Sequence, residues 1–101
     1  MQIYVITAFQ KITPSTIHNF ADLGDRRCVG FYDDENEAKN AVENNFNNIH
    51  DNIYEYVIIE EMHPGIKLPD TKRQLFHWDG ASYCPISVPE LLNHMSNFGI
   101  G

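Results

Sequence analysis

The chain has 101 residues, 43% of them hydrophobic and 21% charged, and a formal net charge of −7 with only seven lysines and arginines. This length allows a single domain, residues 1–101, with one hydrophobic core, and the apolar content argues against a disordered tail. The acidic charge argues against binding to polymeric nucleic acid or to an anionic membrane, because neutralising many phosphates requires a basic face.

Two β-strands are predicted in the first third of the chain. Residues 3–9 are β-branched and aromatic, as strands prefer. The polar segment 10–25 is long for a small domain, so we expect either a short helical turn around residues 15–20 or a loop with a function. Residues 26–32 form the second predicted strand. Its alternation would place Arg27, Val29 and Phe31 on one face and Arg26, Cys28, Gly30 and Tyr32 on the other.

A helix is predicted to follow Asp34. Asp34 and Glu37 have the spacing of a capping box, and the apolar residues that follow at helical spacing are Ala38, Ala41, Val42 and Phe46. The acids of segment 33–37 complement the helix dipole, and a metal or catalytic role is the alternative. The asparagine-rich segment after the helix is predicted to end it.

The second half of the chain is predicted to complete a sheet. Residues 53–62 are apolar on both faces, which indicates a central strand. Segment 73–86 is predicted to be a hairpin with a two-residue Asp79-Gly80 turn, which would set Phe76 opposite Tyr83. A short helix is expected at residues 89–95. The fold class is thus α+β, with a mostly antiparallel sheet of about five strands packed on one main helix and a short C-terminal helix.

Two adjacent arginines, Arg26 and Arg27, stand at the start of the second predicted strand. Alternation sends their side chains to opposite faces. One interpretation is an internal ion pair with Glu55, Glu60 or Asp25, because guanidinium pairs readily with carboxylate. The other is capture of a phosphate group from outside.

Further candidates for a phosphate site are basic and aromatic. Lys72 and Arg73, with Lys67 before them, form the only other local excess of positive charge. Aromatic side chains could stack on a base, with core packing as the alternative. The predicted ligand-binding residues are Arg26, Arg27, Tyr54, Lys72, Arg73, Trp78 and Tyr83.

Little in the sequence points to catalysis, metal binding or a cofactor. The five histidines have no zinc-ligand spacing. Cys28 and Cys84 form no C-x-x-C pair, so we expect two reduced, buried thiols, with a bridge between them as the alternative. A Cys-His nucleophilic pair formed only in the fold stays open. The start of the chain carries no basic leader or membrane-length apolar run, so a cytoplasmic location is expected.

Six segments between Arg26 and Glu90 occur in a familiar order: RRCVGFY, EAKNAVENN, YEYVIIEE, HPGI, LFHW and YCPISVPE. In this the chain resembles a family of small uncharacterised bacterial and phage proteins with the pattern R-x-V-G-[FW]-[FY], A-x-x-x-V-x-x-N, Y-x-Y-x-V-I-E, P-G and [WF]-F-x-W. The matching positions are Arg27, Val29, Gly30, Phe31, Ala38, Val42, Asn45, Tyr54, Tyr56, Ile59, Glu60, Pro64, Gly65 and Trp78.

The resemblance implies no activity. It implies a phage setting, in which a counter-defence or host-modulating role in the host cytoplasm is worth considering. The chain departs from the family's Asp-Ile-x-Glu after the helix, because Asn48 stands at the first of these positions. A carboxylate role there is not expected.

These observations lead to one expected function and two alternatives. We expect a non-enzymatic protein that sequesters a small phosphate-bearing ligand such as a signalling nucleotide. A homo-oligomer is expected, because a small sheet has edges to cover and the tail residues Phe98 and Ile100 have no evident place in a monomer core. The first alternative is a protein-interaction module that inhibits or modulates a host protein through its acidic surface. The second is a weak hydrolase of the same ligand class.

Overall fold

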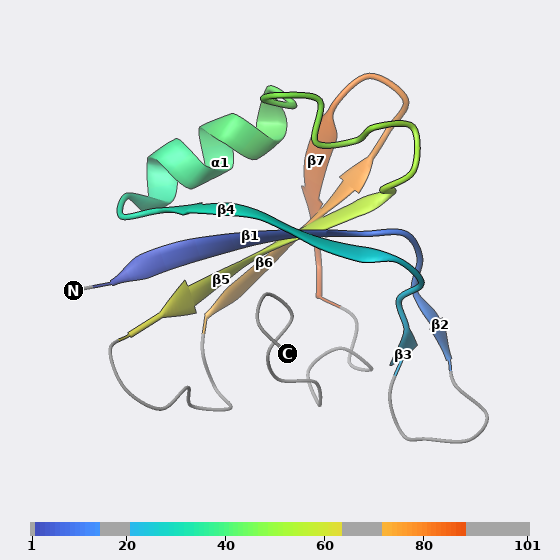
Figure 1. The fold of residues 1–101 in the computed structure, drawn as a ribbon, viewed down its shortest axis with the longest axis horizontal. Helices are drawn as coiled ribbons and strands as arrows, with labels where there is room; N and C mark the ends of the chain where they lie inside the picture. Colours follow the sequence, from blue (N-terminus) through green and yellow to red (C-terminus); the bar gives the residue numbers. More distant parts are fainter. Residues whose placement is uncertain (1, 15–20, 64–71, 89–101) are drawn as a thin grey trace.

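The computed structural model describes residues 2–14, 21–63 and 72–88, and its main feature is a five-stranded antiparallel sheet (Figure 1). The strand order is β4-β1-β5-β6-β7, and one helix, α1, packs on the sheet, so the predicted α+β class is confirmed. The sheet strands are β1 (Ile3–Phe9), β4 (Arg26–Tyr32), β5 (Tyr56–Met62), β6 (Arg73–Trp78) and β7 (Tyr83–Ile86).

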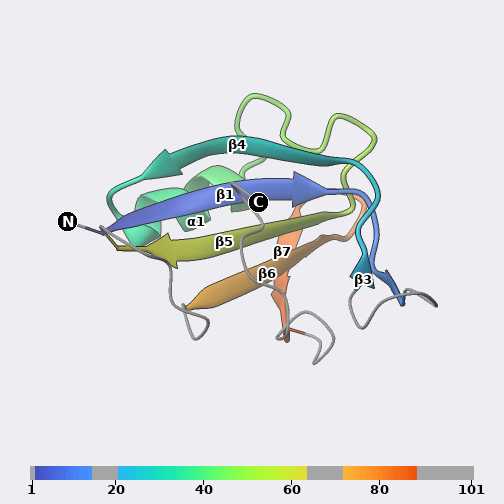
Figure 2. The same ribbon diagram turned by 60° about the horizontal axis from the view of Figure 1, so that its bottom comes forward.

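Segment 10–25 contains a small ribbon that the sequence did not predict. Strands β2 (Thr13–Pro14) and β3 (Ala21–Asp22) pair with each other beyond the end of the main sheet (Figure 2). The turn expected at residues 15–20, the C-terminal helix expected at 89–95, the tail and Lys67 lie outside the described residues.

Helix α1 (Glu35–Glu43) begins where the sequence indicated. The Asp34 carboxylate accepts hydrogen bonds from the backbone N–H groups of Asn36 at 2.8 Å and Glu37 at 3.2 Å. This satisfies two of the donors that a helix leaves free at its start. Ala38, Ala41 and Val42 are buried against the sheet, as predicted.

The helix ends one turn earlier than its apolar spacing suggested. Asn45 has a positive φ of 50° and donates to the Val42 carbonyl, and the N–H of Phe46 donates to the Ala41 carbonyl. These two bonds define a Schellman motif, in which asparagine accepts the left-handed conformation more easily than most residues. Phe46 therefore lies beyond the helix, and its placement on the helical face was wrong: it is 44% exposed.

The central strand separates two apolar layers. The layer beneath α1 contains Ile6, Ala8, Val57 and Ile59, while Phe9 and Ile58 belong to a second cluster on the opposite face. Residues Val57 to Glu60 of β5 are all buried, so the prediction of a central strand is confirmed. The strand begins at Tyr56 rather than at residue 53.

A β-bulge changes the predicted faces of β4. Ile6 of β1 pairs with Gly30, but the next residue, Thr7, pairs with Cys28, which leaves Val29 as an extra residue. Such an insertion reverses the alternation on its far side. Arg27 and Tyr32 consequently face α1, because they pair with Ala8 and Tyr4 of the layer beneath the helix. Arg26, Cys28 and Phe31 face the other way.

The predicted hairpin exists, but its register differs by two residues. Trp78 pairs with Tyr83, and Phe76 pairs with Pro85 rather than with Tyr83. The loop has four residues because the Asp79 carboxylate accepts hydrogen bonds from the N–H groups of Ala81 at 2.9 Å and Ser82 at 2.8 Å. An aspartate side chain that accepts hydrogen bonds from the backbone two and three residues later stabilises this four-residue loop in place of the predicted two-residue Asp79-Gly80 turn.

Candidate functional site

The sheet register separates the seven predicted ligand-binding residues into two groups. Arg26 pairs with Phe9, Phe9 with Tyr56, and Tyr56 with His77, the residue before Trp78. Arg73 instead pairs with Glu60, four residues further along β5, which corresponds to about 13 Å. Arg26, Arg27, Tyr54, Trp78 and Tyr83 thus gather near one end of the sheet, and Lys72 and Arg73 lie at the other.

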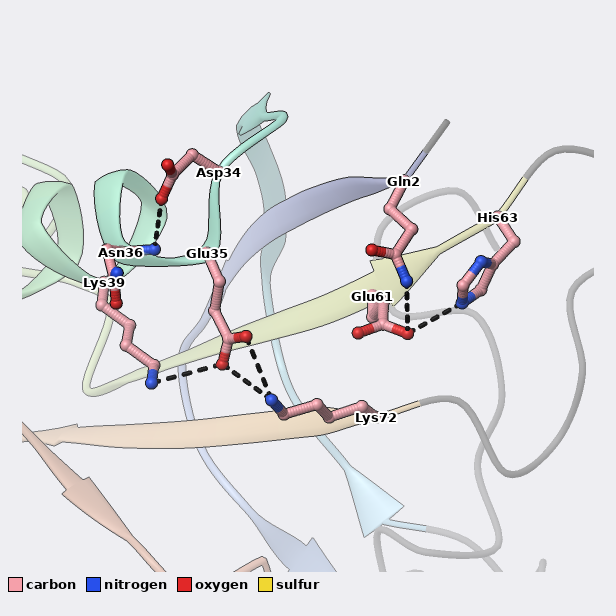
Figure 3. Close-up of polar contacts among 8 residues, drawn as sticks. All are labelled: Gln2, Asp34, Glu35, Asn36, Lys39, Glu61, His63 and Lys72. Atoms are coloured by element: carbon pink, nitrogen blue, oxygen red, sulfur yellow. Dashed lines mark hydrogen bonds and ion pairs between the residues drawn. The ribbon is translucent and has the colours of Figure 1, made fainter.

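Lys72 is neutralised within the chain. Its Nζ lies 2.8 Å and 3.0 Å from the two carboxylate oxygens of Glu35, and Lys39 Nζ approaches the same carboxylate at 3.2 Å (Figure 3). The hydrogen bond from Lys72, followed by that from Lys39, holds the pKa of Glu35 below its usual range. The same carboxylate raises the pKa of Lys72. The Glu35 carboxylate thus occupies the position that the phosphate group of a ligand was predicted to take beside Lys72.

Arg73 is neutralised as well, and in the interior. Its Nε donates to Glu60 Oε2 at 3.1 Å, and the two side chains are 6% and 0% exposed. A buried guanidinium is tolerated only beside a carboxylate that offsets its desolvation. Glu60 was a predicted partner of Arg26 or Arg27, and the structure assigns it to Arg73. The same end of the sheet carries a further polar cluster, in which Gln2 and His63 both contact Glu61 (Figure 3).

Arg27 has internal partners, but they are not the predicted carboxylates. Its Nη2 donates to the Ile49 carbonyl at 3.3 Å, and its guanidinium carbon lies 5.1 Å from the ring centroid of Tyr54. Arg27 forms no ion pair in the described part of the chain, and Asp25 accepts a hydrogen bond from the Tyr54 hydroxyl at 3.1 Å instead. Arg27 is exposed, and its guanidinium makes no direct contact with a carboxylate of the described residues.

Arg26 is on the opposite face and is exposed. Its side chain has no hydrogen bond or ion pair with any residue that the structure describes. Glu55, the third predicted partner, lies 3.6 Å from His77 Nε2. Of the two interpretations of the arginines, the internal ion pair is not found for either one within the described ranges, and neither guanidinium at the start of β4 contacts a carboxylate there.

The predicted stacking platform is part of the core. Tyr83 is buried and its hydroxyl donates to the Tyr54 carbonyl at 2.6 Å, and burial raises the pKa of this hydroxyl. Trp78 packs edge-on against Tyr83 and stacks on His50, with ring centroids 4.0 Å apart. Tyr54 is buried under Arg27, and burial, followed by the bond to Asp25, raises its pKa. Tyr54 and Tyr83 are buried, and Trp78, which is partly buried, stacks on a neighbour from the same chain.

His50 was missed by the sequence interpretation, which considered histidines only as zinc ligands. It stacks on Trp78 and meets the edge of Tyr83, and its Nε2 is buried without a hydrogen-bond partner in the described structure. Nothing in the segment NNIHDN distinguishes this histidine, because its neighbours come from the distant hairpin.

A cavity of about 130 Å³ lies beside β4. Four consecutive strand residues, Val29 to Tyr32, form one wall, and the other walls come from β1, α1 and the loop after it. Because consecutive strand residues point to opposite faces, the strand backbone itself borders the cavity. A Cβ at Gly30 would meet no atom within 4 Å, so the strand leaves open space at this position.

Two exposed phenylalanines are among the residues that line this cavity. Phe31 is 65% exposed and Phe46 is 44% exposed, and both line the cavity. Ile49 lines it too, and the Ile49 carbonyl holds Arg27, so a guanidinium stands near one end. We call the strand edge, the cavity and its two phenylalanines the β4 groove. The sequence contained a partial signal for it, since Phe31 and Gly30 were assigned to this strand.

The two cysteines are not arranged for a bridge. Cys28 is exposed, contrary to the expected burial, and lies on β4, while Cys84 lies on β7 at the opposite edge of the sheet. Four strand spacings of about 4.8 Å separate them, well beyond the reach of a disulfide. Cys84 Sγ donates to Asp79 at 3.3 Å, whereas an activated thiol is found beside a cation.

The described residues contain no group of three or more metal-ligating side chains. Asp79 is committed to its turn, and its bonds from Ser82, Ala81 and Cys84, in that order, lower its pKa. Within the described residues, no helix has the length and apolar character that crossing a membrane requires.

No family model matches the chain, and neither the curated proteins nor the solved structures contain a match to it.

Proposed function

We propose that the protein is a non-enzymatic interaction module and that the β4 groove is its binding surface. The supporting observation is a seven-residue strand at the edge of the described sheet, beside a cavity of about 130 Å³ whose lining includes two exposed phenylalanines. An edge strand offers free backbone donors and acceptors to an extended segment of another chain, and neighbouring apolar pockets select its side chains. The occupant of this surface would be an extended segment of another protein chain, either a host protein that is modulated in this way or a second copy of this chain.

The two edges of the described sheet differ in how well they suit this role. β7 has four residues and includes Pro85, which lacks the N–H needed to extend a ladder. Short length and proline are common protections of an edge strand. β4 is longer and contains no proline. The partner is therefore proposed at β4 and not at β7.

Charge supports a partner with acidic residues. Arg26 and Arg27 place two positive charges at the start of β4 on a chain whose net charge is −7. Opposite charges across an interface accelerate association and fix the register of the partners. The proposal thus uses the locally basic end of β4, not the acidic surface at large.

Matched variants on the two edge strands test this function. The tagged protein is immobilised and its captured proteins are identified, with Phe31→Glu as the test and Ile86→Glu as the control. Ile86 is a suitable control because it is an exposed apolar residue (41%) on β7. We expect Phe31→Glu to abolish capture of a specific protein and Ile86→Glu to retain it. Equal capture by both variants would contradict the proposal.

Sequestration of a small phosphate-bearing ligand, such as a signalling nucleotide, is the second proposed function. One observation favours it: Arg26 and Arg27 have no carboxylate partner in the described chain. Native mass spectrometry of protein purified from cells should then detect a bound phosphate compound, and Arg26→Gln/Arg27→Gln should lose it. Absence of any such mass in the wild type excludes this function, and recovery of a cleaved product would favour a hydrolase.

A further inference from the structure

We infer that the partner of the β4 groove is the β4 groove of a second copy of this chain, joined by antiparallel pairing of the two β4 strands. This inference rests on the proposed function, because it names the partner of the same surface. It also answers why two arginines begin β4 and acids follow directly after its end.

The charges around β4 match only one direction of self-pairing. Arg26 and Arg27 begin the strand, and the exposed Asp33 follows its last residue, with Asp34 next. Parallel pairing of two copies would place arginines beside arginines, and like charges opposite each other destabilise a sheet. Antiparallel pairing can place Arg26 of each copy beside Asp33 of the other. Charged side chains often prevent an edge strand from pairing with another chain. Here the charges disfavour parallel pairing and favour antiparallel pairing.

The bulge at Val29 selects the register. A sheet that continues through a two-fold axis keeps the faces of both copies aligned, so paired residues must share a face. Arg27 and Tyr32 both face α1, and Cys28 and Phe31 both face away from it. The register with Val29 opposite Gly30 brings Arg27 beside Tyr32 of the second copy and Cys28 beside Phe31. Without the extra residue of the bulge, these pairs would not match.

In this register Arg26 stands opposite Asp33 of the second copy. Arg26 has no ion pair or hydrogen bond within the described chain, and Asp33 is exposed. Each copy contributes one such pair, so the dimer contains it twice. The pairing supplies a counter-ion for the guanidinium that lacks one in the subunit.

The apolar features of the groove fit the same arrangement. Phe31, 65% exposed, would be covered by the second copy. Val29 of one copy would lie opposite Gly30 of the other, where a Cβ meets nothing within 4 Å, so the close approach of the two strands meets no side chain at this position. Because both copies use the same edge, the dimer has no free β4 edge and assembly stops at two chains.

Charge reversal with its compensating swap tests the inference. Sedimentation equilibrium of the wild type should give twice the chain mass of 11.6 kDa, with weaker association at high salt. Arg26→Asp and Asp33→Arg should each weaken the dimer about tenfold or more, since each replaces two attractions by two repulsions. The double variant Arg26→Asp/Asp33→Arg should restore it. Ile86→Glu on β7 serves as the control and should remain dimeric.

A disulfide trap tests the register separately. In a Cys84→Ser background, Phe31→Cys introduces a thiol that would face Cys28 of the second copy, close enough for a bridge. Mild oxidation should yield a covalent dimer, and Ile86→Cys in the same background, at an exposed site on β7, should not. Circular dichroism confirms that each variant is folded.

A wild type that is monomeric up to about 100 μM would overturn the inference, as would a dimer that survives both single charge reversals. Neither result decides the proposed function. The proposed function depends on which proteins are captured. If the wild type captures a protein other than this chain and Phe31→Glu does not, the proposed function stands even though the inference of a dimer fails. If the chain is monomeric and Phe31→Glu changes no capture, the proposed function fails as well.

Discussion

Replacing Arg73 by methionine should be among the most destabilising single changes in the described sheet. Methionine keeps most of the length of the side chain but removes the charge. Glu60, 0% exposed, then retains its carboxylate without the guanidinium at 3.1 Å. Breaking a buried pair from one side is costly, because the remaining charge keeps its desolvation penalty and loses its main compensation.

Lys72, the residue before Arg73, provides a control that separates the effect of burial on an ion pair from the effect of its N–O distance. At an effective dielectric constant of about 20, charges 3.1 Å apart attract by about 5 kcal/mol. The Lys72–Glu35 pair is shorter, at 2.8 Å, but Lys72 is 54% exposed. Solvent screening and side-chain entropy reduce such surface pairs to about 0–1 kcal/mol. We therefore expect Arg73→Met to cost about 3–5 kcal/mol and Lys72→Met at most about 1 kcal/mol.

Urea unfolding followed by circular dichroism measures both free energies at pH 7. If Arg73→Met does not fold, the double variant Glu60→Met/Arg73→Met keeps the test decisive. Removing both charges should recover most of the stability, since apolar replacement of a buried pair is often neutral. Equal losses for Arg73→Met and Lys72→Met, or a double variant as unstable as the single one, would refute the reasoning that burial decides the strength of these pairs.

Three further outcomes follow from contacts of the described residues. The pKa of Glu35 is lowered in the folded protein, so its ionised carboxylate stabilises the fold above the pH range in which an unfolded glutamate titrates. This stabilisation is lost as the pH falls below about 4, so the Tm of Glu35→Gln should fall less on acidification than the Tm of the wild type. An equal fall in Tm for both proteins would refute this. Asn52 has a φ of 57°, so Asn52→Ala should cost about 1 kcal/mol in urea unfolding while Asn52→Gly costs nothing, and equal effects would contradict the strain. Tyr83→Phe removes the 2.6 Å hydrogen bond to the Tyr54 carbonyl and should lower the free energy of unfolding by about 1–3 kcal/mol. Burial raises the pKa of Tyr83, so above about pH 10 this tyrosine ionises more readily in the unfolded chain and the fold loses stability. Tyr83→Phe lacks this ionisation, and alkaline unfolding should show a smaller loss of its stability.

The elements that depend on short stretches of sequence were predicted well. Strands 3–9 and 26–32 have the predicted bounds, and the helix begins after Asp34, whose carboxylate caps it. Capping, alternation and helical spacing act over a few residues, so their signals are complete in the local sequence. The end of the helix was less accurate, because the apolar spacing of Phe46 competed with the left-handed conformation of Asn45, and the conformation prevailed.

The register of the sheet was not predictable in the same way. The four-residue hairpin loop depends on two backbone bonds to one aspartate, and the bulge in β4 shows only when β1 lies beside it. A shift of one residue exchanges the faces of every later side chain. The faces of Arg27 and Phe31 were therefore decided by a neighbour that the strand itself does not encode.

The sequence by itself determined the class of fold, its main strands, the start of its helix and the acidic charge of the surface. Only the tertiary structure decided which cation meets which anion: Arg73 takes Glu60, Lys72 takes Glu35, and the arginines of β4 receive no carboxylate from the described chain. The reason is range. A strand or a cap is decided by residues a few positions apart, whereas an ion pair depends on strand order, which brings together side chains far apart in sequence and leaves others at an open edge.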